Sequence, residues 1–117
     1  MTIPDPLYSQ LPLTEATYFI LLSLAPEPKH GYGMMKDVYA LSQGRIHFST
    51  GTLYGAIKRL LEQGWIERVE ETVSGNNGQV RKAYGLTELG NRILRAEVDR
   101  LNALVEVAQL RIAGEGA

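Results

Sequence analysis

The chain has 117 residues, a net charge of −1 and no cysteine. This length supports one compact domain and is too short for two. The lack of cysteine excludes disulfides and cysteine-ligated metal sites in this sequence, and it is typical of a reducing cytoplasm, where we expect the protein to act.

Charge is unevenly distributed along this nearly neutral chain. Residues 29–64 hold five Lys and Arg against two acids, so five minus two gives this segment a local charge of +3. A local excess of positive charge indicates a site for a polyanion.

The longest strongly apolar run, residues 18–25, is too short to cross a bilayer. The N-terminus lacks the basic region of a signal peptide, so we expect none, and with no spanning segment we expect no membrane partner.

Two helices are predicted in the first part of the chain. The first lies in "LTEATYFILLSLAPEP", where Thr14 can cap the N-terminus and Pro26 stops the helix. It is apolar around much of its circumference, which predicts burial on more than one side. The second runs from about Gly31 to Ser42, with Gly44 just beyond its end.

The remaining elements alternate between extended and helical segments. "RIHF", residues 45–48, predicts a minimal strand with Ile46 and Phe48 on one side. Ser49 or Thr50 then caps a third helix that ends near Gly64. "WIERVEETV" and "QVRKAYGL" have strand composition and are separated by "SGNNGQ", which predicts a β-hairpin with a mobile tip. A long helix follows Thr87.

The order of these elements predicts a mainly α fold with a small β-hairpin. Helix, helix, short strand, helix and hairpin match a winged helix-turn-helix, which we assign to residues 1–86. Residues 87–117 then form a long C-terminal dimerisation helix. In a winged helix the third helix enters the DNA major groove by its outer face.

That outer face carries two glycines four residues apart, Gly51 and Gly55, beside Lys58. An interior glycine costs a helix roughly 0.5–1 kcal/mol relative to alanine, so solvent alone would not favour this choice. Our interpretation is that the missing Cβ atoms let the helix approach a phosphate ridge or a base edge. The alternative is that Gly51 lies in the first turn, where glycine costs little, and that Gly55 is accidental.

The final helix carries a heptad pattern that predicts a dimer. The pattern is shorter than three heptads, so a second apolar surface is needed, and the first helix is the obvious source from a partner subunit. The predicted dimerisation residues are Phe19, Ile20, Leu24, Leu94, Val98, Leu101, Val105, Ala108 and Ile112. The alternative is that this stripe packs only on its own domain.

Three blocks give the chain a family resemblance: "LTEATYFILLSLAPEPKHGYGMMKDV", "STGTLYGAIKRLLEQGWIE" and "RKAYGLTELG". They resemble, in order, the signature blocks of the PadR family of bacterial transcriptional regulators, over about residues 13–101. The short C-terminus resembles the branch with a single dimerising helix. The resemblance implies a winged-helix repressor that forms a homodimer, binds an inverted-repeat operator in double-stranded DNA and is released by a small hydrophobic or aromatic effector.

Pattern and resemblance together give a set of candidate DNA contacts. They are Tyr32, Lys36, Ser49, Thr50, Gly51, Thr52, Tyr54, Gly55, Lys58, Arg59, Arg81 and Lys82. The role of Tyr32 as a phosphate contact is implied by the resemblance. Arg81 and Lys82 point to opposite faces of a strand, so at most one faces a given DNA strand. The segment "SGNNGQVRKAY" is poorer in Arg and Gly than the wing of many family members.

Other classes of function have less support in the sequence. No Ser, His and Asp set has catalytic spacing, and "GYG" and "GNNG" lack the context of a phosphate-binding loop, so we expect no enzyme and no cofactor. His30 and His47 are isolated, which argues against a metal site. A protein-interaction winged helix that does not touch DNA, and a small-ligand-binding module, remain as alternatives to an operator-binding regulator.

Overall fold

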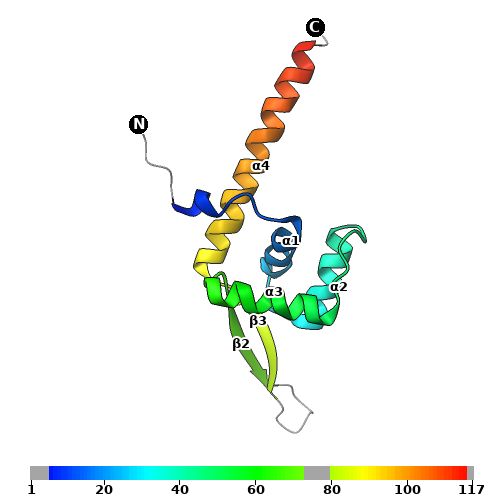
Figure 1. Ribbon diagram of the computed structural model, residues 1–117, viewed down its shortest axis with the longest axis vertical. Helices are drawn as coiled ribbons and strands as arrows, with labels where there is room; N and C mark the ends of the chain where they lie inside the picture. The colour runs from blue at the N-terminus through cyan, green and yellow to red at the C-terminus, as the bar shows by residue number, and fades with distance from the viewer. Residues whose placement is uncertain (1–5, 73–79, 116–117) are drawn as a thin grey trace.

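The computed structural model describes residues 6–72 and 80–115 of the chain (Figure 1). Its elements in chain order are the 3-10 helix η1 (Pro6–Gln10), α1 (Glu15–Leu24), β1 (Lys29–His30), α2 (Gly31–Leu41), α3 (Thr50–Gln63), β2 (Ile66–Thr72), β3 (Val80–Leu86) and α4 (Glu88–Glu115). The predicted order of helices and hairpin strands is confirmed. The predicted turn "SGNNGQ" lies outside the described residues.

The sheet is antiparallel, with strand order β1-β3-β2. The hairpin runs in continuous register from Ile66 opposite Leu86 to Thr72 opposite Val80. The prediction of a strand at residues 45–48 is wrong, because the third strand is Lys29–His30, paired with β3. In residues 45–48 the apolar side chains serve the core instead: Phe48 is buried, and the backbone N–H of Ile46 donates to the Ser42 hydroxyl at 2.9 Å.

Helix α3 has well-defined ends. The sequence predicted an end near Gly64 and left Ser49 and Thr50 as alternatives for the N-cap. Ser49 is the N-cap, and its hydroxyl accepts from the Thr52 backbone N–H at 3.2 Å. Gly64 ends the helix in the left-handed conformation, with φ of 77°, which glycine adopts without strain. Helix α3 buries Leu53, Ile57 and Leu60 among other residues, so its opposite face turns to solvent.

A single hydrophobic core holds the helices and the sheet together. It takes residues from every helix α1–α4, with Ile20, Met34, Leu53 and Ile93 each completely buried. Burying an aliphatic side chain of this size contributes about 1.5–3 kcal/mol. The start of α4 is therefore part of the same core as the winged helix.

The N-terminus of α4 is fixed to the end of α3 and the start of β2. The Thr87 hydroxyl donates to the Gly64 carbonyl at 2.6 Å, and the Thr87 backbone N–H donates to the Trp65 carbonyl at 3.1 Å. A Cβ atom on Gly90 would overlap that same Trp65 carbonyl oxygen, so only glycine allows α4 to approach this closely. Helices α3 and α4 are thus held in one fixed relation.

A buried carboxylate makes a second attachment for α4. Glu97 is 2% exposed, and it accepts from the Leu13 backbone N–H at 2.7 Å and from the guanidinium of Arg100. The hydrogen bond from Arg100 lowers the pKa of Glu97, partly opposed by desolvation, and the bond from Leu13 lowers it further. Glu97 therefore remains ionised and joins α4 to the segment that leads into α1.

Beyond this attachment α4 leaves the body of the molecule. Figure 1 shows its C-terminal half extending alone, and residues 102–114 are all exposed. The chain measures 67 Å along its longest axis against 35 Å and 23 Å across. Within residues 6–72 and 80–115, no helix has both the length and the apolar character needed to span a lipid bilayer.

Candidate nucleic-acid interface

The outer face of α3 is polar and open. Gly51, Gly55 and Lys58 are exposed, as are Thr50, Thr52, Tyr54 and Arg59 around them. A Cβ atom on Gly51 or Gly55 would meet nothing within 4 Å. Packing among the described residues therefore requires neither glycine, and what the two glycines provide is a smooth outer surface that a partner can approach closely.

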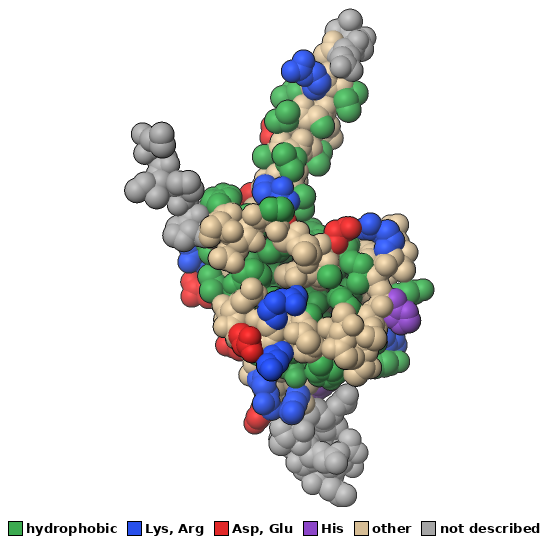
Figure 2. Space-filling view, viewed as in Figure 1, with side chains coloured by type: hydrophobic (Ala, Val, Ile, Leu, Met, Phe, Trp, Pro, Cys, Tyr) green, Lys and Arg blue, Asp and Glu red, His purple; other side chains and the backbone are tan. Residues whose placement is uncertain are grey.

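Only part of the local positive charge is neutralised within the chain. Lys29 lies 3.6 Å from Asp37, and Arg45 lies 2.8 Å from Glu15. Among the described residues, no carboxylate pairs with Lys36, Lys58 or Arg59. Figure 2 shows basic side chains gathered at the end of the globular part from which the hairpin projects, with acidic side chains among them. These unpaired cations can meet an anionic partner.

Tyr54 lies across the start of α2 rather than pointing freely into solvent. A Cβ atom on Gly31 would be 2.6 Å from the Tyr54 hydroxyl oxygen, so glycine at this position makes room for the ring. Burial raises the pKa of the neighbouring Tyr84 phenol, and the interaction with Tyr54 raises it further. The half-exposed Tyr54 hydroxyl thus lies beside the N-terminus of α2, where free backbone N–H groups favour an anion.

Tyr32 and Lys36 continue this surface along α2. Tyr32 is 69% exposed, the most of any tyrosine in the described residues, and the Lys36 ammonium lies 5.5 Å from the centre of its ring. This cation–π contact holds the two side chains together on one side of the helix. Tyr32 and Lys36 of α2 therefore lie at the same end of the molecule as α3, the helix that carries Tyr54.

On the hairpin, Lys82 and Arg68 share a face. Lys82 pairs with Glu70 and Arg68 with Tyr84, so strand alternation puts Lys82, Arg68 and Tyr84 on one side of the sheet. Tyr84 belongs to the same buried core as Leu53 and Ile57 of α3, so this side adjoins α3. Arg81 lies on the opposite side of β3, opposite Glu71, and its side chain is outside the described atoms. Arg68, half-exposed, is a cation at this surface that sequence reasoning did not select.

The predicted dimerisation residues separate into three groups by their exposure in the single chain. Ile20, Leu24 and Leu94 are 0%, 2% and 5% exposed within the single chain, which leaves them no surface for a partner. Their assignment to a dimer interface is therefore corrected: they close the chain's own core. Phe19, Val98 and Leu101 are half-buried, whereas Val105, Ala108 and Ile112 are exposed.

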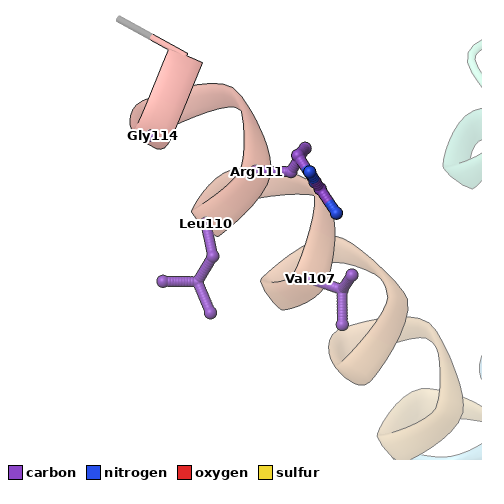
Figure 3. A pocket seen from close by; sticks show the side chains of 4 residues that line it. All are labelled: Val107, Leu110, Arg111 and Gly114. Carbon is purple, nitrogen blue, oxygen red and sulfur yellow. The ribbon is translucent and has the colours of Figure 1, made fainter. Parts of the chain in front are cut away.

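The projecting half of α4 is more apolar than the heptad pattern indicated. Leu104, Val107 and Leu110 are 56%, 67% and 71% exposed. A shallow hollow on this helix is lined by Val107, Leu110, Arg111 and Gly114, which Figure 3 labels on the C-terminal part of the helix. The spacing of these residues, i, i+3, i+4 and i+7, is that of a hole that receives a side chain from a facing helix. Sequence reasoning did not select Val107 and Leu110, because they fall outside the predicted heptad positions.

The two histidines have local partners. His30 Nδ1 lies 3.0 Å from the Lys82 carbonyl, and the His47 ring packs edge-on against Tyr39 with centroids 5.4 Å apart. Among the described residues, no three side chains of His, Cys, Asp or Glu gather as a metal site would need.

Comparison with models of known protein families assigns the chain to one family. A family model described as "Transcriptional regulator PadR-like family" matches residues 20–96. The chain belongs to the PadR-like family. It is thus a transcriptional regulator of the winged-helix type and not an enzyme, as the sequence predicted. The comparison with curated proteins gives no match.

Solved structures of PadR-like proteins share this fold. A PadR family regulator from Clostridium difficile R20291 superposes with a TM-score of 0.68 at 21% identity, over 85% of this chain and 99% of that chain. A PadR-like transcription factor from Bacteroides fragilis gives a TM-score of 0.66 at 27% identity, over 90% of this chain and 97% of that one.

A third structure contains a nucleic acid. It is PadR of Bacillus subtilis in complex with operator DNA, with a TM-score of 0.62 at 22% identity. The match covers 74% of this chain and 48% of that one.

Proposed function

We propose that this PadR-like regulator is a repressor that binds an inverted-repeat operator as a homodimer and is released by a small hydrophobic or aromatic effector. In this proposal residues 1–86 are the DNA-binding unit, residues 87–117 the dimerisation helix, and the site of action the cytoplasm. The observation that carries it is the outer face of α3, where Gly51 and Gly55 are open and Lys58 has no acidic partner among the described residues.

Each part of the surface has a role in this proposal. Thr52, Gly55 and Lys58 face the major groove, where a helix without Cβ atoms can lie closer to base edges. Tyr32, Lys36 and Tyr54 hold phosphates beside the N-terminus of α2, which fixes the position of the protein on the duplex. The remaining proposed contacts are Ser49, Thr50, Gly51, Arg59, Arg81 and Lys82, to which we add Arg68.

The dimer follows from the chemistry of α4. A long helix whose exposed half carries Val105, Ile112 and Leu110 leaves a large apolar surface in water, which a second copy would cover. Its two-fold symmetry would place two α3 helices on half-sites about 10 bp apart, or a multiple of that. The effector would bind between the two subunits. There the apolar surface of α4 covers more of the helix circumference than contact with one partner helix requires.

The test is selection of bound fragments from the genome of the source organism, followed by retardation assays over a salt series. We expect an inverted repeat, and an affinity whose logarithm falls linearly with the logarithm of salt, by about 0.9 for each phosphate contacted. A protein-interaction winged helix would select no repeat and retard no fragment at low salt, and that outcome would overturn the proposal.

The effector needs a separate test. A panel of aromatic acids and uncharged aromatics is added to the protein alone, and the melting temperature is recorded. The same compounds are then added to the protein–DNA complex. We expect at least one compound to raise the melting temperature and release DNA. A panel that changes neither would remove the effector and leave the DNA-binding proposal intact.

A further inference from the structure

Two hydroxyl groups at the N-terminus of α3 form a short hydrogen-bonded chain. The Ser49 hydroxyl accepts from the Thr52 backbone N–H at 3.2 Å and donates to the Thr52 side-chain oxygen at 2.9 Å. A hydroxyl has one hydrogen to donate and two lone pairs that can accept. Among the described residues the Thr52 hydroxyl donates to no group, so its hydrogen is left for a partner. Because it already accepts from Ser49, it is also a stronger donor.

The same chain of hydroxyls occurs at the N-terminus of α1, but there the second hydroxyl is buried. Thr14 accepts from the Thr17 backbone N–H at 3.1 Å and donates to the Thr17 hydroxyl at 3.0 Å. Thr17 is 7% exposed, whereas Thr52 is exposed on the outer side of α3. Capping accounts for both pairs of hydroxyls, and only in α3 does the second side chain also face a possible partner.

The side chain of Thr52 is short, so it can touch a base only if α3 comes close to the floor of the major groove. Gly55 lies three residues further along, on the same side of the helix, and Gly51 precedes Thr52. A Cβ atom at either glycine would meet no described atom within 4 Å. The two glycines therefore allow the close approach that a short side chain needs to reach a base edge.

The hydroxyl and methyl groups of a threonine together match one base. In the major groove thymine presents the O4 acceptor beside its 5-methyl group, whereas cytosine presents an N4 donor, and guanine presents acceptors without a methyl group. We therefore propose that Thr52 recognises a thymine in each half-site, with its hydroxyl donating to O4 and its methyl group packing on the 5-methyl group.

Ser49 acts as a positioning residue in this contact. Its own hydrogen bond occupies a lone pair of the Thr52 oxygen and leaves the Thr52 hydrogen directed to the partner. The contact rests on the proposed function, which places the outer face of α3 in the major groove. It adds to that function the identity of one base and the pair of side chains that select it.

The test uses the inverted repeat that the protein selects, with each thymine of a half-site replaced in turn. Deoxyuridine removes only the methyl group, and wild type should bind it about threefold more weakly at one position. 5-Methylcytosine opposite deoxyinosine keeps the methyl group and the minor-groove pattern but replaces the O4 acceptor by a donor. Binding should weaken about tenfold at that same position, because the Thr52 donor loses its partner. Unchanged affinity at every thymine would overturn the proposal.

Two variants of Thr52 separate its hydroxyl from its methyl group. Thr52→Val lacks the hydroxyl, and Thr52→Ser lacks the methyl group. Both keep the helix cap, because Ser49 accepts from the backbone N–H of residue 52. Thr52→Val should lose the discrimination against 5-methylcytosine and keep that against deoxyuridine, and Thr52→Ser should do the reverse. If either variant discriminates against both analogues as wild type does, Thr52 does not recognise this base.

The first helix supplies the matched control. Thr17→Val makes the same change at the same cap position of α1, and it should leave the discrimination between the duplexes unchanged. If Thr17→Val changes this discrimination as much as Thr52→Val does, the effect comes from helix capping, and the proposed contact is wrong.

Ser49→Asp tests the positioning role. Aspartate is a good N-cap but can only accept, so the Thr52 hydroxyl should turn toward the carboxylate. Discrimination against 5-methylcytosine should then fall toward that of Thr52→Val. The measured quantity is the ratio of affinities for two duplexes of equal charge, which cancels the repulsion between the added carboxylate and DNA. An unchanged ratio would show that Ser49 does not position the hydroxyl.

Failure of the base contact can be distinguished from failure of the proposed function. If no fragment is retarded at low salt, the proposed function is wrong and the base contact is wrong with it. If an inverted repeat is bound with the expected salt dependence, but Thr52→Val discriminates among the duplexes as wild type does, DNA binding stands and only the role of Thr52 is wrong.

Discussion

Two exposed surfaces of this molecule have opposite chemistry. The outer face of α3 presents open glycines and cations that pair with no carboxylate of the described residues, whereas the projecting half of α4 presents Leu104, Val107 and Leu110 to water. Exposure alone does not indicate the partner. A face that keeps its polar groups solvated suits a hydrated polyanion, and an apolar face of this extent suits another protein surface. The comparison therefore supports our proposal that the two surfaces bind different partners.

These two surfaces are also mechanically connected. Thr87 and Gly90 fix the start of α4 against Gly64 and Trp65 at the end of α3. Whatever sets the angle between two α4 helices would therefore also set the distance between two α3 helices. This connection makes the comparison testable by substitutions in either surface.

The largest effect is expected at α4. Leu104→Glu places a charge in the centre of the exposed apolar surface, and it should yield a monomer that binds DNA about 100-fold more weakly, because the advantage of two linked half-site contacts is lost. Leu104 is 56% exposed in the single chain, so the winged helix should remain folded. Asn102→Glu, about 200° away around the same helix, is the matched control and should remain dimeric. If Leu104→Glu remains a dimer, the assignment of the exposed apolar surface of α4 to a second copy of the chain is wrong.

The next effect concerns the glycines of α3. Gly55→Glu should reduce DNA affinity about 100-fold, because a like charge would face the phosphates, and thermal melting should be unchanged or higher. Gly55→Ala separates charge from close approach. It should raise the free energy of unfolding by roughly 0.5–1 kcal/mol, since no described residue meets its Cβ atom, and still weaken DNA binding. Parallel losses of stability and affinity would show that Gly55 serves internal packing.

A smaller effect is expected at Gly31. Gly31→Ala should push the Tyr54 hydroxyl away from the start of α2 and weaken DNA binding about tenfold, the loss of one hydrogen bond to a charged group. Its effect on stability should be small, because the displaced atom is the end of an exposed side chain. The control is Gly33→Ala, two residues further along α2, whose Cβ atom would meet nothing within 4 Å. Equal DNA affinity in both variants would remove Tyr54 from the interface.

The smallest effect is expected on the stability of the fold when the pH changes the protonation of Glu97. Glu97 lies in the part of α4 that packs on the body of the molecule. Its folded-state pKa lies below the ordinary value of 4.5, so the stability it contributes is complete above that value and is lost as the pH falls through the folded pKa. The difference in unfolding free energy between wild type and Glu97→Gln, measured by denaturant titration, should therefore shrink from about pH 6 to about pH 3. A difference that is constant over this range would show that the carboxylate is not held ionised.

Sequence reasoning was most successful where local chemistry decides the structure. Ser49 and Gly64 mark the ends of α3 through capping and backbone conformation, and both are evident from a few neighbouring residues. The short strand was misplaced because two residues, Lys29 and His30, carry no periodicity, and their pairing depends on the edge that β3 offers. Elements set by local rules were thus predictable, and those set by distant partners were not.

The residues of the candidate interfaces show the same limit to prediction from sequence. In a sequence, an apolar helix residue that faces its own core cannot be told from one that faces a partner subunit. Ile20, Leu24 and Leu94 were therefore assigned to a dimer interface, although they are buried in the chain's own core. Glu97 has the appearance of an ordinary solvated charge until Leu13 and Arg100 are seen beside it. Contacts between residues far apart in sequence, such as Gly31 with Tyr54, become visible only in three dimensions.

The central claim is that two copies of this chain present two α3 helices to one DNA duplex. The most direct measurement is the mass in solution, by sedimentation or light scattering at micromolar concentration, of the protein alone and bound to a duplex carrying the selected inverted repeat. The account predicts a free mass of twice 13.0 kDa and two chains on each duplex. A free chain of 13.0 kDa that binds the duplex as a single copy would contradict it.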